Sequence, residues 1–211
     1  MKVIDQYHEI LTPISPGGVE ELKRIELAAR TCYKSEDKIS EDETSAVKMV
    51  KMLIQSGHEA MLEHSSLTVK FVTDRATANE IVRHRMASYA QESTRYCNYS
   101  KDKFGKEITV VRPVFLNEDT IWQAANEEEW MTACGIAEQA YFMMLKQKCT
   151  PQDARAVLPQ CLKTELIMTA NYREWRHFLR LRTAEDAHPQ IRDLAMGLLA
   201  DLQMSIPVVF D

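Results

Sequence analysis

The sequence predicts an α+β fold in which a small, mainly antiparallel sheet is flanked by long helices. Stretches in which apolar and polar residues alternate are few and short, whereas apolar residues recur at spacings of three and four over much of the chain. The chain has only six glycines, which favours long helices and little flexible linker. Its 211 residues are enough for one sizeable core, and we expect a single domain over 1–211.

Three segments have the residue pattern of strands. Residues 2–11 alternate loosely and precede a turn rich in proline and glycine. Residues 66–73 alternate more strictly, with three large apolar side chains on one face. Residues 107–112 form a third β-rich run, which ends before Pro113. These three segments are the predicted sheet.

Helical spacing of apolar residues predicts the other elements. The predicted helices cover residues 19–32, 40–57, 74–85, 117–148 with a break near Asn126, 150–158, 165–169, 172–182 and a last helix that begins at His188-Pro189. Ser40 with Glu43 has the spacing of a capping box. Asn171 with Glu174 has the same spacing, and Asp74 can cap the helix that follows it.

The composition excludes several classes of function. A net charge of −5 and a sequence pI near 5.7 argue against a general nucleic-acid binder, which needs a broadly basic face. No apolar run is long enough to cross a bilayer and no signal peptide follows Met1, so we expect a cytoplasmic protein with no membrane partner. The five cysteines are odd in number and form no C-x-x-C pair, which indicates reduced thiols.

The stretch Arg83–Tyr96, RHRMASYAQESTRY, concentrates positive charge in this acidic chain. Guanidiniums offer paired donors that match phosphate oxygens, and serine hydroxyls and turn amides can complete the shell of an oxyanion. The helix 74–85 would present a partially negative C-terminus here, so the arginines and the following loop must hold the anion. Glu80 lies one turn before Arg83 on that helix. The competing interpretation is a helix end whose arginines offset the macrodipole.

A second basic segment begins where the predicted helix 172–182 starts. Asn171 and Arg173 lie together at that helix N-terminus, which suits oxygen-rich ligands. His177 and Arg180 share the side of Arg173, and for Arg176 and Arg180 a solvated face is the interpretation we favour.

Two histidines upstream raise the question of a metal. His58 and His64 are six residues apart, which on a helix turns the second roughly 240° from the first. A zincin site needs histidines four apart, on one helix face, so we expect no metal site.

Seven residues separate Arg83-His84-Arg85 from Ser93, and Arg95 lies two residues after Ser93. This pattern resembles the signature of the flavin-dependent thymidylate synthases. The resemblance extends, in the same order along the chain, over residues 57–64, 96–103 and 155–190.

The resemblance implies an enzyme that methylates dUMP to dTMP, with FAD as redox cofactor, methylenetetrahydrofolate as one-carbon donor and NADPH as reductant. It also implies a homotetramer in which neighbouring subunits complete each site. The residues implied to bind dUMP are Glu80, Arg83, Gln91, Glu92, Ser93, Thr94, Arg95, Arg155 and Arg182. Those implied to bind FAD are His58, Arg83, His84, Arg85, Gln91, Asn171, Arg173, His177 and His188.

Arg182 is the residue that the resemblance marks as catalytic. A fixed cation at the uracil ring stabilises the deprotonated imide and makes the carbon that receives the methyl group more nucleophilic. The chain departs from the family at three positions: relatives often have Gln at Glu80, Asn at His177 and Ser at Cys32.

A nucleophilic cysteine is the rival mechanism, because classical thymidylate synthases use one. Their Pro-Cys-His element is absent, and Cys161, after Pro159 and before an apolar segment, is predicted to be buried. Ser93 could act as a nucleophile, but no base is evident nearby and phosphate contact is the simpler role.

Three alternative functions stay open at the level of sequence. One is a related flavin-dependent UMP methylase, since the ribose pocket is not visible in the residues. Another is an RNA-binding module that uses the segments 83–95 and 173–182 with tyrosine stacking, which the acidic pI disfavours. The third is a helical interaction protein without chemistry, using the segment 130–148, whose methionines and aromatics we assign to packing or subunit contact.

Overall fold

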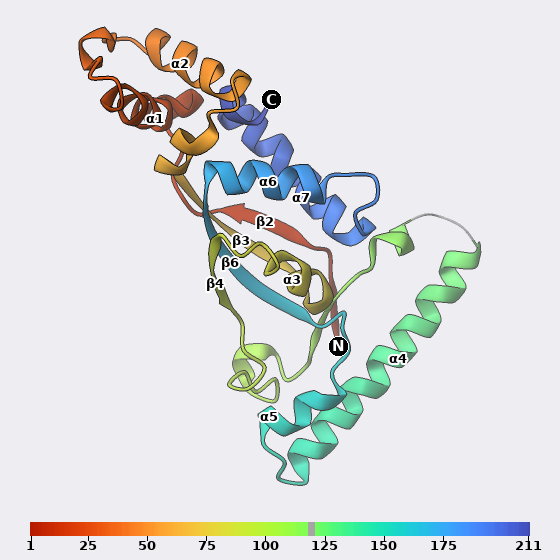
Figure 1. Ribbon diagram of the computed structural model, residues 1–211. Coiled ribbons are helices and arrows are strands. Elements are labelled where there is room, and N and C mark those ends of the chain that lie inside the picture. Colours follow the sequence, from red (N-terminus) through yellow and green to blue (C-terminus); the bar gives the residue numbers. More distant parts are fainter. Residues whose placement is uncertain (118–120) are drawn as a thin grey trace. The chain divides into compact units, whose positions relative to one another are not determined.

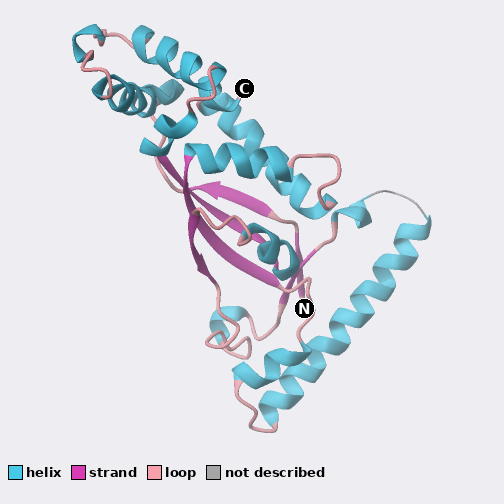
Figure 2. Cartoon of the chain, viewed as in Figure 1, coloured by secondary structure: helices cyan, strands magenta, loops and turns pink. Residues whose placement is uncertain are grey.

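A computed structural model describes residues 1–117 and 121–211, and it has the mixed helix and strand composition that the sequence predicts (Figures 1 and 2). Its strands are β1 Lys2–Ile4, β2 Tyr7–Ile10, β3 Ser66–Asp74, β4 Ala87–Gln91, β5 Thr109–Val111 and β6 Lys163–Asn171. Its α-helices are α1 Val19–Thr31, α2 Thr44–Gln55, α3 Arg75–Ile81, α4 Ile121–Lys146, α5 Pro151–Ala154, α6 Tyr172–Arg182, α7 Pro189–Ser205 and α8 Pro207–Phe210. None of the helices in this part of the chain is long and apolar enough to cross a membrane.

The strands form two sheets. Four strands pair in the order β2-β3-β6-β4, and β1 pairs in parallel with β5, with Val3 opposite Val110. In the larger sheet, the amide of Leu11, just after β2, donates to the carbonyl of Thr68, while the Thr73 hydroxyl donates to the side chain of Gln6, just before β2. Residue numbers on β2 and β3 thus run in opposite directions, which makes the pair antiparallel.

Strand β6 is antiparallel to β3 by the same criterion. The hydroxyls of Thr68 and Thr169 lie 2.9 Å apart, and the amide of Arg75 reaches the carbonyl of Leu162 at 3.2 Å. The prediction of a small, mainly antiparallel sheet is confirmed.

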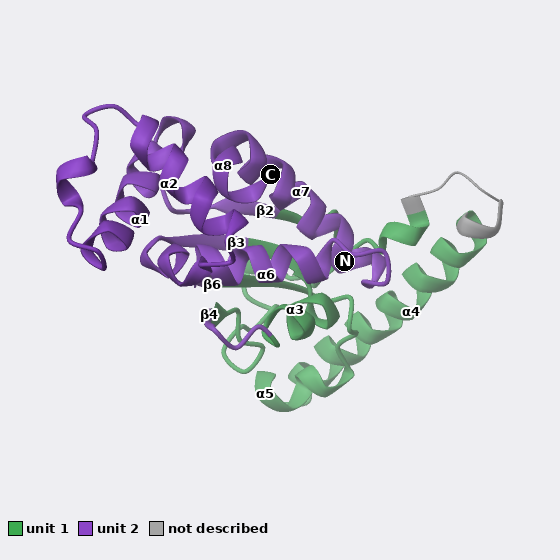
Figure 3. Ribbon diagram, turned by 45° about the horizontal axis from the view of Figure 1, so that its top comes forward, with its two compact units in different colours: residues 1–7, 71–83, 90–167 green, residues 8–70, 84–89, 168–211 purple. Residues whose placement is uncertain are grey.

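The chain divides into two compact units, and several strands contribute residues to both (Figure 3). Unit 1 holds residues 1–7, 71–83 and 90–167, and unit 2 holds residues 8–70, 84–89 and 168–211. Each unit buries its own set of apolar side chains.

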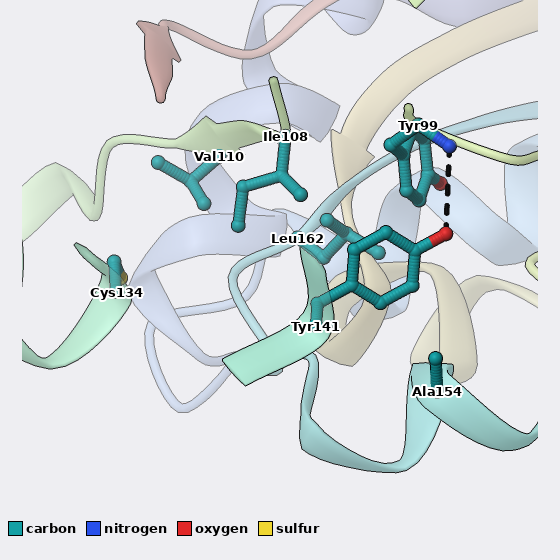
Figure 4. Close-up of a cluster of buried hydrophobic side chains, with 7 residues drawn as sticks. All are labelled: Tyr99, Ile108, Val110, Cys134, Tyr141, Ala154 and Leu162. Carbon is teal, nitrogen blue, oxygen red and sulfur yellow. Dashed lines mark hydrogen bonds between the residues drawn. The ribbon is translucent and has the colours of Figure 1, made fainter. Parts of the chain in front are cut away.

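The core of unit 1 forms where α4 meets the segments around β5 and the start of β6 (Figure 4). Tyr141 and Cys134, seven residues apart on α4, pack with Val110 and Leu162. The Tyr141 hydroxyl also accepts the amide proton of Tyr99 at 3.4 Å, as the dashed line in Figure 4 shows. Apolar packing by this helix was the sequence prediction, and it holds.

The core of unit 2 lies under α6 and α7. Trp175 and Phe178 of α6 are buried, and the Trp175 indole donates to the carbonyl of Leu67 at 3.0 Å. The four residues that the sequence assigns to the buried side of α7 are all buried: Ile191, Leu194, Leu198 and Leu202.

Caps explain where several helices begin. The Asp74 carboxylate accepts the amide proton of Thr77 at 2.7 Å, and the Asn171 side chain accepts that of Glu174 at 2.9 Å. Both caps were predicted. The Ser40 cap was wrong, because α2 begins only at Thr44, whose amide donates to Asp42.

Other predictions about elements need correction. Residues 165–169 are strand, not helix, because buried and half-exposed side chains alternate along β6 and the chain pairs on both sides. The segment 2–11 is two strands in different sheets rather than one. Helix α4 runs unbroken from Ile121 to Lys146, so the predicted break near Asn126 does not occur. Residues 118–120 of the predicted helix lie outside the described residues.

Two glycines with positive φ provide a matched test of this packing. Gly18 (φ +70°) caps α1, and a Cβ there would come within 2.6 Å of the Ile206 side chain. Gly57 (φ +70°) ends the α2 segment, and a Cβ there would meet nothing within 4 Å. We expect Gly57→Ala to cost about 1 kcal/mol of unfolding free energy through backbone strain. Gly18→Ala should cost about 2–4 kcal/mol, because the clash with Ile206 adds to the same strain.

Urea unfolding followed by circular dichroism measures both variants. Equal losses in the two variants would show that Ile206 does not pack against Gly18 as described.

Candidate active site

The predicted site residues fall into two groups, one in each compact unit. Residues 80, 83, 91–95 and 155 belong to unit 1, and the remaining residues belong to unit 2.

The segment Arg83–Arg85 lies outside the helix that precedes it. Helix α3 ends at Ile81, and the amide of Arg83 donates to the carbonyl of Glu80 at 3.2 Å in the turn that follows. The prediction of a helix reaching Arg85 was wrong, because the chain from Ala87 onward pairs as β4 and must leave the helix first. Arg83 and Arg85 are exposed, whereas His84 is buried.

In unit 1, the loop of residues 91–95 has the donors of an anion site. The Ser93 carbonyl accepts the amide protons of Tyr96 and Cys97, and the Ser93 hydroxyl accepts that of Arg95 at 3.3 Å. Arg155 NH1 donates to the hydroxyl of buried Thr94 at 3.2 Å. Two exposed guanidiniums and a tight turn therefore meet at one loop, and the residues brought together are among those that the resemblance implies for dUMP.

The beginning of the same loop is anchored to β6. The amide of Glu92 donates to the carbonyl of Glu165 at 2.8 Å, and the Gln91 side-chain amide donates to the hydroxyl of Thr164 at 3.3 Å. Lys163 contacts the Glu92 carboxylate at 2.9 Å. A cavity of about 380 Å³ opens beside these residues.

In unit 2, a cavity of about 530 Å³ lies along α6, and we call it the α6 cavity. Its lining comprises Glu59, Glu63, Met86, Asn171, Arg173, Glu174, Arg176, His177, Leu179, Arg180, Thr183, Leu199 and Phe210. The lining includes three of the residues implied to bind FAD, namely Asn171, Arg173 and His177. His58, Arg85 and His188 are exposed and are not among the residues that line the α6 cavity. His188 instead caps α7, since its side chain accepts the amide proton of Gln190.

Arginines line the α6 cavity, and two of them pair with carboxylates. Arg173 NH1 lies 2.7 Å from a carboxylate oxygen of Glu63, and Arg176 NH2 lies 3.4 Å from Glu59. Arg176 also donates to the carbonyl of Val209, but its buried Nε–H has no hydrogen-bond partner among the described residues. The prediction that Arg176 belongs to a solvated face was wrong; Arg180 is exposed, as that prediction required.

Next to the cavity, Arg182, His84 and Glu174 form a hydrogen-bonded chain. Arg182 Nε donates to His84 Nε2 at 3.0 Å, and His84 Nδ1 lies 3.3 Å from the Glu174 carboxylate. An arginine can only donate, so His84 Nε2 is unprotonated and Nδ1 carries the proton that Glu174 accepts. Burial, then the positive charge of Arg182 and then His177, lower the His84 pKa from 6.5 to about 4. His84 is therefore neutral at pH 7.

Tyr89 anchors the turn after this histidine. Its hydroxyl donates to the carbonyl of His84 at 2.5 Å. Burial, with a smaller contribution from Glu174, raises the Tyr89 pKa to about 12, so the phenol keeps its proton.

Possible ligand atoms of His84, Glu174 and His177 lie within 4.8 Å of one another, which is close enough to consider a metal. Arg182 faces one ring nitrogen of His84, and Arg180 faces Nδ1 of His177 at 3.1 Å. A neutral imidazole has a single lone pair for a metal, and in both rings an arginine N–H occupies it. The geometry favours a hydrogen-bond network over a metal site.

Residues 19–208 match the family described as thymidylate synthase complementing protein. The chain belongs to this family. It is 34% identical, over 94% of its length and 82% of the relative, to a flavin-dependent thymidylate synthase of Corynebacterium aurimucosum. Flavin-dependent thymidylate synthases of Mycobacterium avium and Mycobacterium tuberculosis are 34% and 33% identical, over 88% of this chain and 77% of each relative. The resemblance that the sequence analysis names is thereby confirmed, and with it the prediction of an enzyme.

Several residues beside the two cavities escaped the sequence analysis. Glu59 and Glu63 lie within the segment 57–64 that carries the resemblance, but no role was assigned to them, and they pair with the arginines of α6. Lys163 was not considered at all, because the segment after it was taken for a helix. Had residues 163–171 been interpreted as a strand with side chains on alternating faces, Lys163 and Glu165 would have been placed on the same face.

The pKa of His84 makes stability depend on pH. A neutral, buried histidine binds fewer protons than the same residue in the unfolded chain, so stability falls as the pH drops from 6.5 toward 4. This histidine should account for a loss of up to about 3 kcal/mol between pH 7 and pH 4.

Urea unfolding at several pH values measures this loss, with His84→Gln as the comparison. The variant should lack this part of the acid destabilisation, and equal pH dependence in both proteins would contradict the assignment. Histidine NMR of the Arg182→Gln variant should show a higher His84 pKa that still lies below 6.5, because burial is the larger cause.

Proposed function

We propose that the protein methylates dUMP to dTMP, with methylenetetrahydrofolate as one-carbon donor, FAD as redox cofactor and NADPH as reductant. The observation that carries the proposal is the grouping of Ser93, Thr94, Arg95 and Arg155 at one loop, in a chain that belongs to this family. These four residues lie up to more than sixty positions apart in the sequence. At this loop they present hydroxyl and guanidinium donors together, which suits a nucleotide monophosphate.

The dUMP phosphate would be held by Ser93, Arg95 and Arg155, with the Thr94 hydroxyl keeping Arg155 at the loop. Gln91 and Glu92 would contact the nucleotide from the same loop. Glu80, in the last turn of α3, and Arg83, in the turn that follows it, would reach the sugar or the phosphate.

The α6 cavity supports the FAD part of the proposal. Arg173 and Arg176 line it, the unpartnered Nε–H of Arg176 offers a buried donor, and α6 begins at Asn171 with its partially positive N-terminus. This donor set suits a diphosphate. His58, Arg85, His177 and His188 would complete the FAD site together with neighbouring subunits of a homotetramer. Bound FAD, once reduced by NADPH, would supply the reducing equivalents that turn the transferred one-carbon unit into a methyl group.

Arg182 would stabilise negative charge on the uracil ring. Its orienting partner His84 is neutral at pH 7, so the guanidinium is fixed in place by an acceptor that does not cancel its charge. A preorganised, half-buried cation of this kind favours the deprotonated imide and the nucleophilic ring carbon. Glu174 accepts the Nδ1 proton of His84 and so keeps the ring in the tautomer that Arg182 requires.

Replacement of Arg182 tests the catalytic role. Arg182→Ala should lower kcat for dUMP methylation by at least about 10²-fold, the loss typical of one charge-stabilising donor. Bound FAD, measured by the visible absorbance of the purified protein, should stay close to the wild-type level. Arg24→Ala is the control, since Arg24 is an exposed arginine of α1 that pairs with Glu21 three residues before it. Near-normal turnover in Arg182→Ala would refute this role, and a wild-type protein that cannot be reconstituted with FAD would refute the proposed function.

Replacement of Arg173 tests the FAD site. The Arg173–Glu63 pair is exposed, so its loss should change the unfolding free energy by no more than about 1 kcal/mol. Arg173→Gln should weaken FAD binding by about ten-fold, which corresponds to one charge-assisted hydrogen bond. Equilibrium titration of the FAD-free protein with FAD measures the change, and Arg24→Gln is the matched control. An unchanged affinity would place the diphosphate elsewhere.

A further inference from the structure

Lys163 is a largely buried lysine beside the 91–95 loop, and it contacts two carboxylates. Its ammonium lies 2.9 Å from the Glu92 carboxylate and 2.7 Å from that of Glu165. The side chains of Lys163 and Glu92 are 19% and 12% exposed, so water screens their contact poorly. The second oxygen of Glu92 accepts a hydrogen bond from the Tyr99 hydroxyl at 3.2 Å.

Lys163 acts at the point where the loop leaves the sheet. Glu92 is the last residue whose amide pairs with β6, and the next residue, Ser93, begins the turn that presents the amide of Arg95. Because Lys163 holds the Glu92 carboxylate in one position, it also fixes the direction in which the turn starts.

Lys163 also controls the charge beside the proposed phosphate site. With Lys163, the three side chains Glu92, Glu165 and Lys163 carry a net charge of −1; without it they carry −2. A phosphate dianion at Ser93, Arg95 and Arg155 would be repelled by the uncompensated carboxylate of Glu92.

We infer that Lys163 is a positioning residue for nucleotide binding: through Glu92 it holds the 91–95 loop in place and cancels the carboxylate charge next to the phosphate. This inference rests on the proposed function. Lys163 does not touch the substrate in this role, and its effect passes entirely through Glu92.

The experiment combines Lys163→Met, Glu92→Gln and the double variant in a cycle, with Lys106→Met as the control. Lys106 forms a comparable contact with Asp102 at 2.8 Å, but both side chains are largely exposed. Lys163→Met should raise KM for dUMP by about ten-fold and change kcat by less than about three-fold, as expected when a buried charge loses its partner. Lys106→Met should leave both constants unchanged.

The double variant distinguishes positioning through Glu92 from general damage. Because Glu92→Gln removes the uncompensated charge, the double variant should have a KM within about three-fold of Glu92→Gln alone. If the two changes multiply instead, or if Lys163→Met leaves KM unchanged, the inference is wrong. Should Lys163→Met fail to fold, the comparison of the double variant with Glu92→Gln still decides the question.

A measurement without nucleotide separates this inference from the proposed function. Hydrogen exchange of the amides of Arg95, Tyr96 and Cys97 should be faster in Lys163→Met than in the wild type, because those amides donate within the turn that follows Glu92. Unchanged exchange would overturn the positioning role. A wild type that neither binds nor methylates dUMP would overturn the proposed function, whatever the exchange rates show.

Discussion

The pairing of strand β6 is the constraint on which both groups of site residues depend. Its first residues, Lys163 to Glu165, anchor the 91–95 loop within unit 1 through backbone and side-chain hydrogen bonds. Its last residue, Asn171, caps α6 within unit 2 and so sets where that helix begins. The strict alternation along β6 buries one side chain in two, which holds the strand in a single register. A slip of one residue would turn Lys163 away from Glu92.

Electrostatics explains how an acidic chain can offer anion sites. The arginines implied to bind ligands are held by three different kinds of group: a hydroxyl for Arg155, an imidazole for Arg182 and an exposed carboxylate for Arg173. The hydroxyl and the neutral imidazole carry no charge, and water screens the exposed Arg173–Glu63 pair. Lys163, by contrast, lies between two carboxylates, which together offset its positive charge. Positive charge is thus kept local and directional, which suits a small anionic ligand better than a polymer.

The sequence analysis succeeded where local signals are strong. The caps at Asp74 and Asn171, the buried side of α7 and the strand β3 all follow from spacing and residue type, and all agree with the structure. It failed at residues 165–169, because a short apolar run fits a buried helix and a strand equally well. It failed again at Arg83–Arg85, because the end of α3 is decided by the pairing of β4 with β6, which involves residues about eighty positions apart.

By itself, the sequence determined the family, the charge balance and the residue types of both basic segments, because these depend on composition and on spacings within single elements. The tertiary structure decided the partners: His84 between Arg182 and Glu174, Arg155 at Thr94, and Lys163 at Glu92. Each of these contacts joins residues sixty or more positions apart, and only the folded backbone brings such residues within hydrogen-bonding distance. The neutral state of His84 follows from that arrangement, since burial and a neighbouring cation, rather than the residue type, set its pKa.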